Sequence, residues 1–142
     1  MGQNAELFRT AIQCLNAKDA AGFRAVLAPD VEYLNPQGDY AGRDAAAASF
    51  EPEWRAFSNA KHEIVRLVET PTGVAAQCVW SGTHDAPLAT PVGEVPASGR
   101  SVESGYAIWV DMEAGLARKI QVYFDQMSYA IQLGLLPAPQ TA

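Results

Sequence analysis

The stretch that decides the fold is RSVESGYAIWVDMEAGLARKIQVYFDQMSYAIQLG, which runs from Arg100 to Gly134. Residues 100–111 and 116–124 are rich in β-branched and aromatic side chains, which is typical of strands. Glu113-Ala114-Gly115, between these two segments, predicts a tight turn. A short helix is expected over 126–133, because the glycine that follows can close it. The C-terminal third therefore predicts a β-hairpin that leads into a helix.

Two further strands are predicted upstream of this hairpin. Residues 62–69 and 74–83 carry partly alternating apolar side chains, and Thr70-Pro71-Thr72-Gly73 between them predicts a turn. The segment 85–99 contains three prolines and two glycines, so we expect a loop or the arm of a hairpin there.

The N-terminal half predicts helices. Residues 4–17 place apolar side chains at helical spacing, and Asp19 is expected to cap a second, shorter helix. A short strand is predicted over 31–34. A third helix is expected from 43 to 57, with a break just before Pro52, because proline disrupts a helix interior.

This order of elements, with two helices, a strand, a third helix and then hairpins, defines an α+β domain. A chain of 142 residues fits one domain, so we expect a single domain over residues 1–142. The net charge of −6 disfavours nucleic acids and anionic membranes as partners. No apolar run approaches the length of a membrane span and no signal peptide is recognised, so a cytoplasmic protein is expected.

The cysteines and histidines do not predict a metal site. Cys14 and Cys78 lie far apart in the chain and are expected to be free, buried thiols. His62 and His84 have no nearby acidic or cysteine partners in the sequence, so we expect no metal. His62 precedes a strand and is predicted to be a surface residue.

Several short motifs follow one another in a fixed order. They are WSGTH at 80–84, GEVP from Gly93 followed by Gly99-Arg100, YFDQ at 123–126 and QLGLLP at 132–137. Together they resemble the SnoaL-like polyketide cyclase family of the nuclear-transport-factor-2-like (NTF2-like) superfamily. The resemblance covers residues 5–137.

The resemblance implies a curved mixed sheet wrapped around N-terminal helices, which leaves a cone-shaped apolar pocket. It implies an intramolecular aldol cyclisation of an apolar carbonyl compound, with no metal and no organic cofactor. It also implies that an aspartate acts as acid and base, and Asp125 is the residue at the matching position. Finally, it implies a homodimer formed through the convex face of the sheet, to which we assign Ile120, Val122 and Phe124.

Asp125 supports two interpretations on its own terms. With a side-chain period of two, Gln121, Tyr123 and Asp125 share one face of their strand. If that face lines the pocket, burial raises the carboxyl pKa into a range suited to a general base. Alternatively, Asp125 caps the helix that begins at Gln126.

Further residues are candidates for the pocket. His84 is predicted to hydrogen-bond the substrate or Asp125, or else to be a structural histidine in the hairpin. Asn35 stands where ketosteroid isomerases of the same superfamily carry their catalytic aspartate, and an amide cannot act as a base. The predicted substrate-binding residues are Asn35, Tyr33, Trp54, Phe57, Trp80, Trp109, Tyr123 and Gln121.

The sequence therefore predicts a cofactor-independent, polyketide cyclase-like enzyme that acts on an apolar small molecule. One alternative is a binding module that holds such a molecule unchanged. Another is a different enzyme of the same superfamily, such as an isomerase or an epoxide hydrolase.

Overall fold

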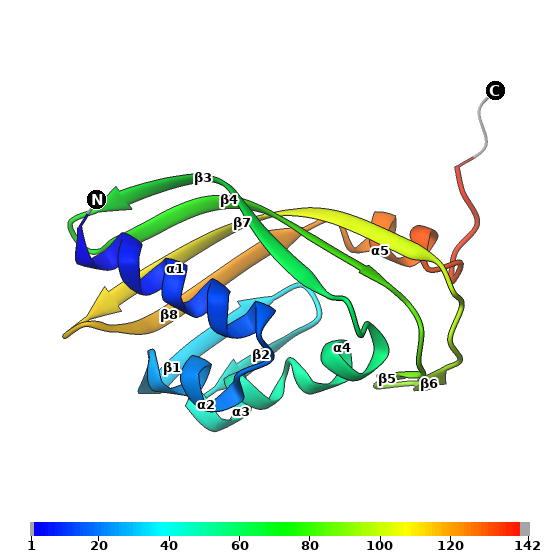
Figure 1. Ribbon diagram of the computed structural model, residues 1–142, viewed down its shortest axis with the longest axis horizontal. Coiled ribbons are helices and arrows are strands. Elements are labelled where there is room, and N and C mark those ends of the chain that lie inside the picture. Colours follow the sequence, from blue (N-terminus) through cyan, green and yellow to red (C-terminus); the bar gives the residue numbers. More distant parts are fainter. Residues whose placement is uncertain (1, 140–142) are drawn as a thin grey trace.

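A computed structural model describes residues 2–139 of the chain. A strongly curved sheet has helices on its concave side, and a small separate hairpin lies at one end (Figure 1). The helices are α1 (Gln3–Asn16), α2 (Ala20–Ala25), α3 (Arg43–Ala48), α4 (Glu51–Ala56) and α5 (Gln126–Gln132). The strands are β1 (Leu27–Asn35), β2 (Gly38–Ala41), β3 (Lys61–Thr70), β4 (Gly73–Thr83), β5 (Leu88–Thr90), β6 (Gly93–Val95), β7 (Ser101–Glu113) and β8 (Leu116–Phe124).

The main sheet has six strands in the order β2-β1-β8-β7-β4-β3. β1 and β8 are parallel, whereas every other neighbouring pair is antiparallel. β5 and β6 form the two-stranded hairpin on their own. The predicted α+β architecture is therefore confirmed.

Two element boundaries differ from the prediction or refine it. The break expected in the third helix separates α3 from α4, and Pro52 lies in the first turn of α4, where proline is tolerated. β1 begins at Leu27 rather than at Val31. The extra residues pair irregularly with β8, since the register shifts between Leu27 and Glu32.

Helix α1 lies over the concave face and is tied to the edge strand β3 at both ends. Its buried residues Ala5, Phe8, Ile12 and Leu15 recur every three or four positions and form one apolar stripe. At its start, Glu69 accepts hydrogen bonds from the amides of Gly2 (2.9 Å) and Ala5 (2.7 Å), so a residue of β3 caps this end of the helix.

The other end of α1 is held by Asn16. Its Oδ1 accepts from the backbone N–H of His62 (2.7 Å), and its Nδ2 donates to the backbone carbonyl of His62 (2.9 Å). At the start of the helix, the hydrogen bonds that Glu69 accepts, chiefly the one from the Ala5 amide, lower the pKa of the Glu69 carboxyl group. The helix is thus fixed lengthwise over the sheet.

The sheet presents the opposite face of β8 to the core from the one that was predicted. Ile120 is buried and Val122 packs against the same core, whereas Tyr123 is 56% exposed. Successive side chains of a strand point to opposite faces of the sheet. If the other face is buried, every side chain of the strand changes sides. Here the more apolar set faces the helices. The dimer contact assigned to Ile120, Val122 and Phe124 is therefore wrong.

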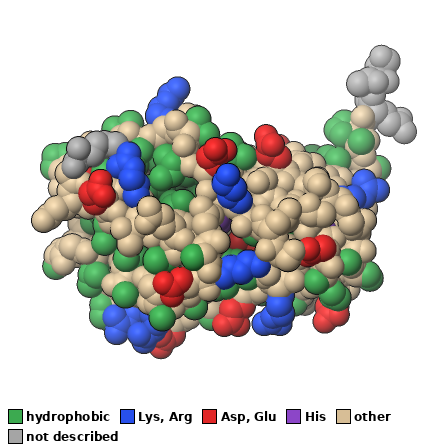
Figure 2. Space-filling model, in the orientation of Figure 1, with side chains coloured by type: hydrophobic (Ala, Val, Ile, Leu, Met, Phe, Trp, Pro, Cys, Tyr) green, Lys and Arg blue, Asp and Glu red, His purple; other side chains and the backbone are tan. Residues whose placement is uncertain are grey.

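The surface shows no concentration of charge of one sign on the face drawn in Figure 2, where acidic and basic side chains alternate with apolar ones. Within residues 2–139, no helix has the length and the apolar character needed to cross a membrane.

We expect Gly73→Ala to destabilise the fold. Gly73 is buried at the start of β4, and a Cβ there would lie 1.9 Å from the carbonyl oxygen of Val110. Because backbone atoms of the sheet would have to move, we expect a loss of about 1–3 kcal/mol in the free energy of unfolding. Urea denaturation followed by circular dichroism measures it. Gly105→Ala is the matched control, since its Cβ meets nothing nearer than 3.9 Å; an equal loss in both variants would contradict the steric explanation.

Candidate functional site

A partly open apolar cavity of about 140 Å³ lies between the helices and the concave face of the sheet. Side chains of α1, α4 and the strands β1, β3, β4, β7 and β8 contribute to its wall. Apolar examples are Phe8, Ile12, Leu15, Ile108, Val110, Ile120 and Val122. Against this background the few polar side chains in the wall stand out, and they define the candidate site.

His62 is the first of these polar residues. It is 8% exposed, and Asn16 holds its backbone on both sides as described above. Its Nδ1 lies 2.8 Å from the hydroxyl oxygen of Tyr106. Burial raises the pKa of the Tyr106 hydroxyl far above its usual range, so this group stays protonated and can donate to Nδ1. An imidazole that accepts this hydrogen bond at Nδ1 carries a proton on Nε2.

Glu53 faces His62 from helix α4. One oxygen of its carboxylate, Oε2, lies 3.7 Å from His62 Nε2, which is too far for a direct hydrogen bond. Neither atom has a hydrogen-bond partner among the described residues. Lys18 fixes the end of α4, because its Nζ donates to the carbonyl oxygens of Trp54 (3.2 Å) and Ser58 (2.9 Å).

The charge of Glu53 acts on three tyrosines. Burial is the main reason why the pKa values of Tyr33, Tyr106 and Tyr129 are raised, and the nearby Glu53 carboxylate raises each of them further. All three line the cavity. The carboxylate thus lies among neutral phenols and apolar walls.

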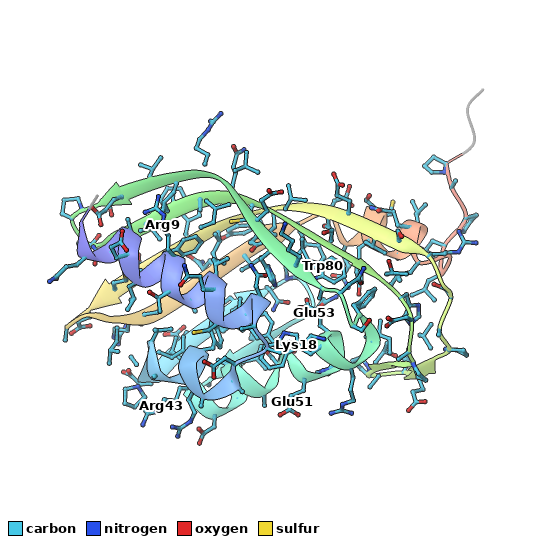
Figure 3. The ribbon with its side chains drawn as sticks, in the orientation of Figure 1. Arg9, Lys18, Arg43, Glu51, Glu53 and Trp80 are labelled. Carbon is cyan, nitrogen blue, oxygen red and sulfur yellow. The ribbon has the colours of Figure 1, made fainter. Side chains whose placement is uncertain are left out.

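Trp80 supplies an unused donor on the sheet side. It is 6% exposed, and its Nε1 has no partner among the described residues. Figure 3 shows Glu53 and Trp80 in the space between α4 and the overlying strands, whereas Glu51 of the same helix points away from it. A buried polar group without a partner costs stability, so such groups are uncommon outside functional sites. Here Glu53, His62 and Trp80 present three such atoms from the wall of one cavity.

Asp125 lies outside this cavity. It caps α5, because its Oδ1 accepts from the Ser128 amide (3.0 Å), and it is exposed at the rim of a shallow groove on the convex face. The capping alternative for Asp125 is therefore the one that the structure contains. Tyr123 and Gln121 share its outward face, and Trp109, 55% exposed, lies opposite Gln121 in the adjacent strand β7.

His84 is buried but does not line the cavity. Its Nδ1 lies 2.9 Å from Ser98 Oγ and accepts from the Ser98 amide (3.2 Å). It contacts the ring of Phe57, which is itself fully buried in a second apolar cluster. Trp54 stacks on Phe50 without reaching the cavity.

Three of the predicted binding residues do line the cavity. They are Tyr33, Asn35 and Trp80. Asn35 also accepts a hydrogen bond from the Gln37 amide (2.7 Å), as a turn-forming asparagine does. The structure thus brings these three together with Glu53 and His62.

Sequence reasoning missed Glu53 and His62 and gave Tyr106 no special role. The signal for Tyr106 was its position two and four residues before Ile108 and Val110, which places it on the same inward face. His62 stands between Lys61 and Glu63, so the local pattern indicated a solvated strand end. Nothing in the sequence near Glu53 distinguishes it from Glu51.

Among the described residues, no group of acidic, cysteine and histidine side chains is arranged to hold a metal ion.

Comparison with known proteins places this arrangement in context. A family model described as the SnoaL-like domain matches residues 8–120. No curated protein sequence matches the chain.

Solved structures resemble the chain closely in shape. A candidate SnoaL-like polyketide cyclase from Jannaschia sp. CCS1 has 17% identity and a TM-score of 0.82, over 95% of this chain and 94% of that one. IdmH, a candidate polyketide cyclase from Streptomyces antibioticus, has 22% identity and a TM-score of 0.80, over 94% and 99% of the two chains. A protein from Catenulispora acidiphila with a ketosteroid isomerase-like fold, solved with trimethylamine, has 16% identity and a TM-score of 0.76, over 96% and 98%. At these identities the likeness establishes the fold.

The buried tyrosines predict how the protein responds to alkali. The folded-state pKa values of Tyr33, Tyr106 and Tyr129 lie above the value of about 10 found in an unfolded chain. The contribution of each tyrosine to the free energy of unfolding is thus fully present below about pH 10. Above that pH, each tyrosine lowers the free energy of unfolding by about 1.4 kcal/mol for every pH unit.

Absorbance at 295 nm, followed with circular dichroism, measures this response. In the wild type, we expect three of the five tyrosines to ionise only as the chain unfolds. In Tyr106→Phe, we expect two tyrosines to do so. Reversible ionisation of all five near pH 10, with the fold intact, would contradict the burial argument.

Proposed function

The chain belongs to the SnoaL-like domain family, and we propose that it catalyses proton transfer at a carbon next to a carbonyl group, in a cyclase-type reaction on an apolar small molecule. The observation that carries this proposal is the approach of the Glu53 carboxylate to the His62 imidazole inside an apolar cavity, with an unpartnered atom on each. An acid–base pair poised in this way is suited to moving a proton to and from a bound substrate.

In the first step, Glu53 Oε2 accepts a proton from the carbon beside the substrate carbonyl. The electron pair of the broken C–H bond becomes an enolate. Glu53 is suited to this role because Oε2 is buried and accepts no hydrogen bond from the described residues. His62 lies beside it with its Nε2–H free to donate, and Tyr106 fixes that tautomer through Nδ1.

In the second step, the enolate carbon attacks another carbonyl carbon of the same molecule and a C–C bond forms. The resulting alkoxide takes a proton either from protonated Glu53 or from His62 Nε2. In the second case, Glu53 then returns its proton to His62 Nε2. Substrate and product are isomers, so no co-reactant is required. Walls that hold the chain in a folded conformation supply much of the rate advantage of such an intramolecular reaction.

The relatives support the reaction class in outline. Two of the similar structures are named as candidate polyketide cyclases, and a third holds the small molecule trimethylamine. The acid–base role of Asp125 stays a prediction, and its exposed capping position gives that role no support. We assign the role to Glu53 and His62 instead.

We expect Glu53→Gln to abolish catalysed proton transfer. An amide cannot take up the proton, so the rate should fall by about 100- to 10,000-fold. The measurement is deuterium exchange at the carbons flanking the carbonyl of cyclohexanone in D₂O, followed by NMR. Glu51→Gln is the matched control, since Glu51 is an exposed glutamate of the same helix. Equal rates in wild type and Glu53→Gln would favour a binding module that leaves its ligand unchanged.

We also propose that the chain forms a homodimer through the convex face of the sheet. Val65, Trp109 and Tyr123 are 63%, 55% and 56% exposed there, and large exposed apolar side chains gathered on one face mark interaction surfaces.

We expect Trp109→Glu to convert a dimer into a monomer, because a carboxylate would then lie in the contact. Sedimentation velocity at micromolar concentration measures this. Leu135→Glu, which changes an exposed side chain beyond α5, serves as the control. A monomeric wild-type protein would overturn the proposal.

A further inference from the structure

We infer that the site takes a compact, open-chain dicarbonyl compound that closes to a single ring, and that its reacting carbonyl oxygen accepts a hydrogen bond from the indole N–H of Trp80. This inference rests on the proposed function, because it names the substrate class of the same site. It adds a ligand size and an anchoring residue, and each follows from a separate observation.

The anchoring group is the Trp80 indole. Its Nε1 is a donor only, it is buried, and no described residue accepts from it. Buried tryptophans normally find a partner for this N–H. The ring is held edge-to-face against Phe57, with centroids 4.8 Å apart, and against Tyr129 at 5.9 Å. The donor is therefore fixed in direction, and a ligand oxygen can supply the acceptor.

The register of the sheet places this donor beside the acid–base pair. Trp80 lies directly opposite His62 in β3 and opposite Ser104 in β7, so the three side chains form one row across the concave face. Side chains opposite each other in antiparallel strands have Cβ atoms about 5 Å apart. Glu53 approaches His62 from the helix side. A carbonyl oxygen held at Trp80 thus brings the adjoining carbon toward Glu53.

The ligand size follows from the cavity. Its volume of about 140 Å³ is close to the engineered apolar cavity of about 150 Å³ that holds one benzene molecule. Pockets for drug-sized ligands are larger, at about 300–1,000 Å³. The walls of this cavity are aromatic and aliphatic side chains packed on one another, as Phe50 is on Tyr33 (5.7 Å). One ring fills this space, whereas fused rings exceed it.

Trp80 can be observed directly by NMR. The chain has three tryptophans, so a protein labelled with ¹⁵N-tryptophan gives three indole signals, which Trp80→Phe and Trp109→Phe assign. The probes are cyclohexanone, benzene and 2-tetralone, which supply one ring with an acceptor, one ring without, and two fused rings. We expect cyclohexanone to move the Trp80 signal downfield in a saturable manner, and benzene to bind without doing so.

Affinities complete the test. We expect Trp80→Phe to weaken cyclohexanone binding about tenfold, the loss of one hydrogen bond, and to change benzene binding less than twofold. Trp109→Phe, on the convex face, should change neither. 2-Tetralone should bind more weakly than cyclohexanone. The inference is overturned if cyclohexanone leaves the Trp80 signal unmoved, or if the two-ring ketone binds more tightly. The wild-type spectrum decides this even where Trp80→Phe does not fold.

The two proposals fail in different ways. If Glu53→Gln retains full proton exchange while cyclohexanone still shifts Trp80, the proposed chemistry fails and the anchoring role stands. If exchange depends on Glu53 but Trp80 does not respond to the ketone, this inference fails alone.

Discussion

The structure depends on the way one edge strand holds one helix. Glu69 near the end of β3 binds the first turn of α1, and Asn16 at the end of α1 binds the main chain of His62 at the start of β3. These contacts fix the helix along the concave face, so its apolar stripe is buried without filling the whole space beneath the curved sheet. The cavity is what remains. The contact of Asn16 that anchors the helix also holds the backbone of the buried His62. One interaction therefore supports both the fold and the candidate site.

The cavity combines a stable wall with polar atoms that the protein itself leaves unused. Four buried side-chain atoms have no partner among the described residues. One is Nε2 of His84, and the other three, on Glu53, His62 and Trp80, belong to residues that line the cavity. Each lowers the stability of the folded state, and apolar substitutions would remove that cost. The presence of these three atoms in one small space, in a protein whose other described polar side chains are mostly exposed or bonded, is the pattern expected when a ligand completes the hydrogen bonding.

Much of the fold could be predicted from the sequence, because local rules fix it. Turn residues at 70–73 and 113–115 set the hairpins, and the apolar spacing in 4–17 sets the first helix. The sequence did not show which face of β8 is buried. Ile120 and Gln121 are adjacent and point to opposite faces, and the alternation of side chains is compatible with burial of either face. The site was harder still. Glu53, His62 and Tyr106 come from α4, β3 and β7, and only the three-dimensional structure brings them together. Asp125 and His84 stand at motif positions, but in the structure each satisfies local backbone or loop contacts.

The parallel pairing of β1 with β8 has a consequence for synthesis of the chain. Tyr33 pairs with Ile120, so the sheet cannot close until β8 has left the ribosome. Contacts between such distant residues form slowly, because a long loop must close first. During that interval the apolar stripe of α1 is covered by α2, β3 and β4, and one edge of β1 and one edge of β7 are unpaired. Newly made chains therefore pass through a period in which exposed strands can join with those of other copies. The cavity comes into being only with the last strand.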